Sequence, residues 1–161
     1  MSDYSFDPYK PKRKMNSGIL VGLIAAVIMM GVHLFFMLIL SGQNSNGWIH
    51  TGDWIANIIQ LFVYFFASHS AAERQYHNQE RDATDALRGV RAAGIGAAIT
   101  TSLLVWVFII VREIIYDATG VTVTPDPFGL CAWIVVDVLL AIGLGAWAGG
   151  MVEKKYKPQG Y

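Results

Sequence analysis

Long apolar segments alternate with short polar ones along the chain. Each apolar segment is long enough to cross the membrane as an α-helix, because a helix rises about 1.5 Å per residue and roughly 20 residues span ~30 Å of hydrocarbon. Polar stretches with turn residues, such as SGQNSNG after Leu40, separate them. We therefore predict an all-α integral membrane protein, a four-transmembrane-helix bundle made of two helical hairpins. The predicted spans are residues 17–40, 48–70, 87–116 and 127–151.

The polar segments outside these spans define the remaining organisation of the chain. The basic, proline-containing residues 1–16 are expected to form a disordered tail, and residues 152–161 a second tail. Residues 71–86 contain neither Gly nor Pro, so the second span is expected to continue beyond the membrane as a helical extension. The transmembrane domain is predicted to cover residues 17–151. Its first apolar run, residues 17–40, is longer than the roughly 7 to 15 residues of a signal-peptide core. We therefore expect it to remain in the membrane.

Basic residues mark one side of the predicted bundle. All Lys and Arg residues except Arg112 precede the first span, surround the connection between the second and third spans, or follow the fourth. Loops rich in Lys and Arg stay in the cytoplasm under the positive-inside rule. We therefore expect both termini to be cytoplasmic (N-in/C-in). The short loops and the absence of an organelle address favour the plasma (inner) membrane of a prokaryote.

Composition agrees with a membrane protein and argues against some functions. Of the 161 residues, 54% are hydrophobic and only 15% are charged, and the formal net charge is +0 at pH 7. A nucleic-acid-binding domain carries clustered basic residues and a net positive charge, so we expect no nucleic-acid partner. The expected partner is the lipid bilayer. Cys131 is the only cysteine, so one chain can form neither a disulfide nor a multi-cysteine metal site.

The second predicted span carries a stripe of polar side chains. Its members follow one another at steps of four, three and four residues, which places them on one face of a helix. Ionisable groups within hydrocarbon cost about 3 kcal/mol on insertion scales and usually face the bundle interior. The stripe is therefore expected to meet polar residues of the other spans in an intramembrane network or pathway. The stripe is Asp53, Asn57, Gln60 and Tyr64, and the residues expected to meet it are His33, Thr101, Arg112 and Asp137.

Small residues share the helix faces of these polar groups and predict where the helices pack. Gly and Ala let helix backbones approach closely in membranes. With the helices packed through these faces, we expect Arg112 to form an ion pair with Asp137 or Asp53, and Arg112→Ala to lower thermal stability in detergent. The expected packing residues are Gly18, Gly22, Gly94, Ala98, Gly145 and Gly149.

Two functions fit these features best. The first is a structural or accessory subunit that packs with itself, as a homo-oligomer, or with a larger membrane complex, and whose polar network fixes the register of its helices. The alternative is a small ion- or solute-translocating membrane protein, with Asp137 as the binding carboxylate and the polar stripe as the wall of a pathway. Four helices enclose little space, so this alternative would need a dimer.

A haem- or quinone-binding membrane anchor is a further alternative. His33 and His50 are the candidate ligands of a b-type haem on the outer side, but their estimated depths differ by about 5.4 Å, one helical turn. We therefore expect no cofactor. The sequence contains no Gly-rich phosphate loop followed by Lys, no HExxH and no nucleophile elbow. We accordingly expect no enzyme, no catalytic residues and no metal site.

Overall fold

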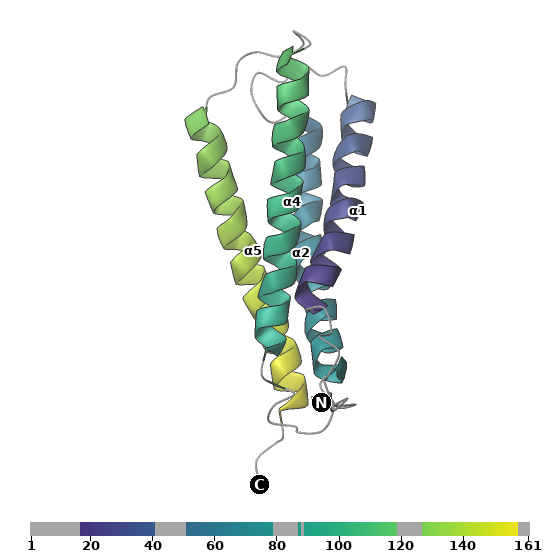
Figure 1. Ribbon diagram of the computed structural model, residues 1–161, viewed down its shortest axis with the longest axis vertical. Coiled ribbons are helices and arrows are strands. Elements are labelled where there is room, and N and C mark those ends of the chain that lie inside the picture. Colours follow the sequence, from purple (N-terminus) through teal and green to yellow (C-terminus); the bar gives the residue numbers. More distant parts are fainter. Residues whose placement is uncertain (1–16, 41–50, 79–86, 88, 119–126, 158–161) are drawn as a thin grey trace, which may run out of the picture.

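The computed structural model describes residues 17–40, 51–78, 87, 89–118 and 127–157. Within these residues the chain is helical and contains no strand. Consecutive helices run in opposite directions, so α1 begins at the end of the bundle where α5 ends (Figure 1). The helices are α1 (Ser17–Leu40), α2 (Thr51–Asn78), α4 (Val90–Ala118) and α5 (Pro127–Tyr156).

All four helices are long and apolar enough to cross a membrane. The prediction of an all-helical protein with four such segments is therefore confirmed. Large apolar side chains cover the outside of the bundle: Val27 and Leu38 of α1 are 68% and 71% exposed, and Leu139 of α5 is 62% exposed. A soluble domain rarely exposes so extensive an apolar surface, whereas hydrocarbon solvates it.

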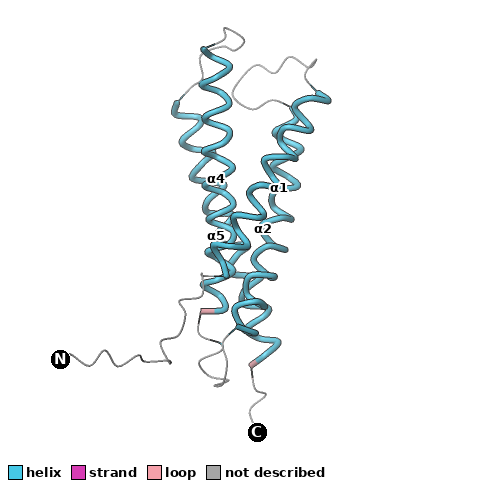
Figure 2. Tube along the Cα trace, turned by 45° about the vertical axis from the view of Figure 1, so that its right-hand side comes forward, coloured by secondary structure: helices cyan, strands magenta, loops and turns pink. Residues whose placement is uncertain are grey.

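The helices are arranged with α2 and α4 in the centre and α1 and α5 on opposite flanks (Figure 1). Both flanking helices pack against both central ones, and α2 also contacts α4. Figure 2 shows that the pair α1 and α2 diverges from the pair α4 and α5 toward the end where α1 finishes. The bundle is therefore tight at one end and splayed at the other.

Glycines explain the tight end. A Cβ added to Gly18 or Gly22 of α1 would lie 2.6 or 2.7 Å from a backbone carbonyl oxygen of α4. A Cβ on Gly145 of α5 would lie 2.8 Å from the Cα of Ile95, and one on Gly149 would lie 2.9 Å from the Cα of Arg91. These helices touch backbone to backbone, which only small residues permit.

Bulkier side chains fill the splayed half. Met29, Val105, Trp106 and Ile109 form a buried apolar cluster there. Because these side chains keep the helices farther apart than glycines do, the axes separate along the bundle. The change from small to large residues thus creates the space in which the candidate site lies.

The ends of α2 and α5 at the tight end are joined by polar and aromatic contacts. Lys155 Nζ lies 2.8 Å from Glu73 Oε1, and the rings of Tyr76 and Tyr156 stack with centroids 4.0 Å apart. The helix α2 continues to Asn78, and α5 continues past the predicted end of the fourth span to Tyr156. The remainder of the predicted extension, residues 79–86, lies outside the described residues, as do both predicted tails apart from residues 152–157.

Candidate functional site

The carboxylate of Asp137 on α5 is surrounded by hydrogen-bond donors from α2 and α4. Its Oδ2 atom accepts bonds from Tyr64 Oη at 2.6 Å, Ser102 Oγ at 2.6 Å, Trp106 Nε1 at 2.9 Å and Gln60 Nε2 at 3.3 Å. A carboxylate oxygen offers about two lone-pair positions. The Oδ2 atom therefore has no room for a further ligand.

Gln60 extends this group to α1. Its Nε2 donates to the hydroxyl oxygen of Tyr64 as well as to Asp137, and its Oε1 lies 3.2 Å from His33 Nε2. Because an amide oxygen only accepts, the Nε2 atom of His33 is the protonated ring nitrogen in this arrangement. His33, Gln60 and Tyr64 are at most 1% exposed. One polar network, buried except at Asp137, thus joins all four helices.

Two members of this network were not anticipated from the sequence. Ser102 and Trp106 of α4 both donate to Asp137, although the sequence pointed to Thr101 instead. Thr101 Oγ1 faces α1 and lies 3.2 Å from the carbonyl oxygen of Gly22. The four-residue step from Ser102 to Trp106 could have shown that these two side chains share a face. Thr101 therefore takes part in the packing of α4 against α1, whereas its neighbour Ser102 belongs to the polar network.

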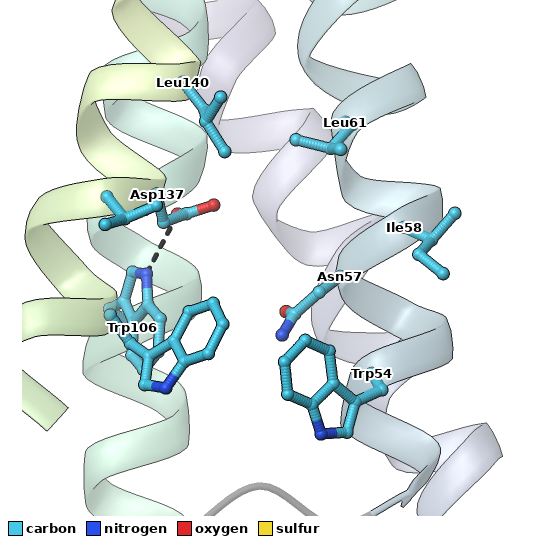
Figure 3. A pocket seen from close by; sticks show the side chains of 9 residues that line it. Trp54, Asn57, Ile58, Leu61, Trp106, Asp137 and Leu140 are labelled. Atoms are coloured by element: carbon cyan, nitrogen blue, oxygen red, sulfur yellow. Dashed lines mark hydrogen bonds between the residues drawn. The ribbon is translucent and has the colours of Figure 1, made fainter. Parts of the chain in front are cut away.

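A cavity of about 150 Å³ lies beside Asp137. Figure 3 shows Asn57 of α2 and Asp137 of α5 on its opposite walls, with Trp54 toward one end and Leu61 and Leu140 toward the other. The lining residues come from α2, α4 and α5, and many are partly exposed, so the cavity opens on the side of the bundle. The lining residues are Trp54, Asn57, Ile58, Leu61, Trp106, Trp133, Val136, Asp137 and Leu140.

The two oxygens of Asp137 have different surroundings. While Oδ2 is saturated with donors, the contact of Oδ1 is with Gln60 Nε2 at 3.5 Å. Among the described residues, no Lys or Arg side chain lies within ion-pair distance of Asp137. The carboxylate is therefore held by neutral groups, and Oδ1 is less hydrogen-bonded than Oδ2.

The expected ion pair between Arg112 and Asp137 is not formed. Arg112 Nη2 instead lies 2.7 Å from Oε1 of its neighbour Glu113, and both side chains are 6% exposed. Asp137 lies level with Trp106, about 9 Å from Arg112 along α4 at ~1.5 Å per residue, which explains why the two do not meet. The alternative partner, Asp53, lies in the first turn of α2, but its side chain is outside the described residues.

This pairing changes the expected behaviour of an Arg112 variant. Arg112→Ala should lower the free energy of unfolding in detergent by about 2 kcal/mol, the scale of a hydrogen bond to a charged partner, because it leaves the Glu113 carboxylate without its guanidinium. Glu113→Gln in the same chain should recover part of this loss, because it removes the charge that Arg112 neutralises. Equal stability of the single and double variants would show that the pair is not the cause.

The haem alternative obtains no second ligand from the described residues. His33 is buried and bonded to Gln60, and His50 lies outside the described residues. Within the part of the chain that the structure describes, no three His, Cys, Asp or Glu side chains gather as a metal site. The chemistry that these residues offer is therefore centred on one carboxylate and its cavity.

Comparisons of the chain with protein-family models, with curated proteins and with solved structures found no match.

Proposed function

We propose that this protein binds a cation at Asp137 and moves it across the membrane, as a small ion- or solute-translocating protein. One observation carries the proposal. A partly buried carboxylate has one oxygen fixed by donors from two other helices, while its second oxygen lies beside a cavity. The carboxylate is thus held in place by its Oδ2 atom, while its Oδ1 atom can still bind a ligand.

The charge of Asp137 would give the site its preference for cations. An ionised carboxylate within hydrocarbon costs a few kcal/mol, about 3 on insertion scales, unless it is neutralised or well solvated. Neutral donors reduce this cost but leave a negative charge that attracts protons and cations. Binding and release of a positive species at Oδ1 would therefore alternate the site between neutral and charged states, as translocation requires.

A flux measurement with Asp137→Asn tests this proposal. The asparagine carbonyl can replace Oδ2 as acceptor while its amide group, which binds no proton, replaces Oδ1. In proteoliposomes loaded with a pH-sensitive dye, we expect an imposed membrane potential to drive proton entry with the unmodified protein and not with Asp137→Asn. Glu153→Gln, which alters a partly exposed carboxylate near the end of α5, should retain the flux. Flux retained in Asp137→Asn would refute the proposal.

A structural or accessory subunit is the second candidate, and the four-helix network favours it. A network that joins every helix fixes their register, and such a bundle could present its exposed apolar faces to another copy or to a larger membrane complex. Purification from the native membrane in mild detergent, with mass spectrometry of what accompanies the chain, separates the two functions. Stoichiometric recovery with a larger complex would favour the accessory role, and a small homo-oligomer would favour translocation.

We also propose that both termini face the cytoplasm of a prokaryotic cell, with the tight end of the bundle inward. The tight end carries Arg91, Lys154 and Lys155, and basic residues stay inside under the positive-inside rule. A fluorescent protein that matures only in the cytoplasm, fused to the C-terminus, should fluoresce. A dark fusion protein of normal abundance would contradict this orientation.

A further inference from the structure

We propose that the cavity beside Asp137 binds a small quaternary ammonium group. This inference rests on the proposed function, in which Asp137 binds a cation, and it names the chemical class of that cation. One available carboxylate oxygen, three indole rings and, apart from Asn57, apolar walls meet around a single cavity.

The indole rings suit a cation that cannot donate hydrogen bonds. Trp54 and Trp133 meet edge to face with centroids 5.0 Å apart, and Trp106 is the third indole in the wall. The N–H of Trp106 is used by Asp137, which fixes the orientation of that ring. Indole faces attract cations through their negative quadrupole, and aromatic cages recognise quaternary ammonium groups in this way.

The polar lining argues against a metal ion. Ca²⁺ takes six to eight oxygen ligands and Mg²⁺ demands octahedral oxygen coordination. In this cavity, Asp137 and Asn57 are the side chains of the lining that carry oxygen. A quaternary ammonium ion needs no ordered ligands, only one negative charge and close apolar or aromatic contact. The cavity supplies these and lacks the oxygens that a metal requires.

The size of the cavity limits the ligand. A protein cavity of about 150 Å³ accommodates a molecule such as benzene, and a trimethylammonium group is of similar size. Because Ile58 and Leu140 in the lining are 58% and 45% exposed, the cavity is open toward the surrounding lipid. The same group could therefore arrive as a free solute or as the headgroup of a choline lipid.

Binding of choline to the purified protein tests the inference. In a detergent free of choline groups, titration followed by calorimetry and by tryptophan fluorescence should show choline binding. The uncharged analogue, in which carbon replaces the quaternary nitrogen, should bind at least about tenfold more weakly, because it lacks the charge that Asp137 and the indoles attract. Equal binding of the two compounds, or no binding of choline, would overturn the inference.

Variants locate the binding in the cavity. Asp137→Asn should weaken choline binding at least about tenfold, and Trp133→Leu about fivefold, by removing the charge and one indole face. Trp147→Leu is the matched control, because Trp147 is 62% exposed on α5 outside the cavity lining. Circular dichroism and gel filtration of each variant establish that it is folded. Choline affinity that is unchanged in both cavity variants would place the binding elsewhere.

Lipid nanodiscs distinguish the two sources of the ligand. If the site holds a lipid headgroup, free choline should bind in phosphatidylglycerol discs and be blocked in phosphatidylcholine discs. If it holds a free solute, choline should bind equally in both. Choline binding without potential-driven flux of either protons or choline would support this inference and refute translocation, whereas flux of protons without choline binding would refute this inference alone.

Discussion

Replacing Gly145 with leucine should prevent α4 and α5 from packing and leave no folded bundle. A single Cβ at this position would lie 2.8 Å from the Cα of Ile95 and 3.0 Å from the carbonyl oxygen of Gly94. These atoms belong to the backbone of α4, so no rotamer change can relieve the clash. Leucine adds three further carbon atoms to the same place, and the two helices can accept them only by separating.

The same glycine allows a graded series with a matched control. Gly145→Ala should cost about 1–3 kcal/mol, the usual range for overpacking, and Gly145→Leu much more. Gly143 lies two residues away on the same helix and has nothing within 4 Å of an added Cβ. Because glycine and leucine differ equally in helix propensity at both positions, Gly143→Leu isolates the steric effect. Gly143→Leu should be at least as stable as the unmodified protein.

Unfolding by titration with a denaturing detergent, followed by circular dichroism, measures these differences. Gel filtration shows whether each variant is monodisperse before titration. The two leucine variants should differ sharply, with Gly145→Leu aggregated or already unfolded in mild detergent. Similar unfolding midpoints for both would show that the close contact between α4 and α5 does not hold the bundle together.

The helical architecture follows from local features of the sequence. Length and hydropathy predict each apolar helix independently of the others, because a segment in hydrocarbon must satisfy its backbone hydrogen bonds internally. The small residues that let helices approach are also readable, since their spacing places them on one face. Gly18, Gly22, Gly145 and Gly149 all lie against α4, where an added Cβ would meet atoms of that helix.

The partners within the site were less predictable, because they depend on how each helix is rotated and which helices are neighbours. The sequence placed Gln60, Tyr64 and Asp137 inside the bundle, but it could not show that Asp137 faces Ser102 rather than Thr101. A rotation of about 100° separates adjacent positions on a helix. Arg112 likewise pairs with Glu113, its neighbour in the sequence, and helix periodicity does not predict this contact.

The cavity is a product of the tertiary arrangement. Its three indoles come from three different helices, Trp54 on α2, Trp106 on α4 and Trp133 on α5. The convergence of the three depends on the divergence of the helices beyond their glycine contacts, and no single segment contains that information.

The second large effect is expected for Asp137→Leu. Leucine has the branched shape of aspartate but is larger and accepts no hydrogen bonds, so Tyr64, Ser102, Trp106 and Gln60 would all lose their shared acceptor. Measured interhelical hydrogen bonds in membranes contribute ~0.6 kcal/mol each, and a buried donor left unpaired costs about 1–3 kcal/mol. We expect a loss of about 3 kcal/mol or more in the free energy of unfolding.

Graded variants separate the structural role of Asp137 from its role in binding. Tyr64→Phe removes one donor and should cost about 1 kcal/mol, while Asp137→Asn keeps an acceptor for the donors and should cost less. Detergent unfolding curves of Tyr64→Phe, Asp137→Asn and Asp137→Leu give the order of their free energies of unfolding. If Asp137→Leu is as stable as the unmodified chain, the network does not hold the helices in register, and the accessory-subunit function loses the observation that favours it. If instead the leucine variant unfolds while the asparagine variant is stable but inactive in flux, one side chain performs both tasks, with Oδ2 holding the bundle and Oδ1 binding the cation.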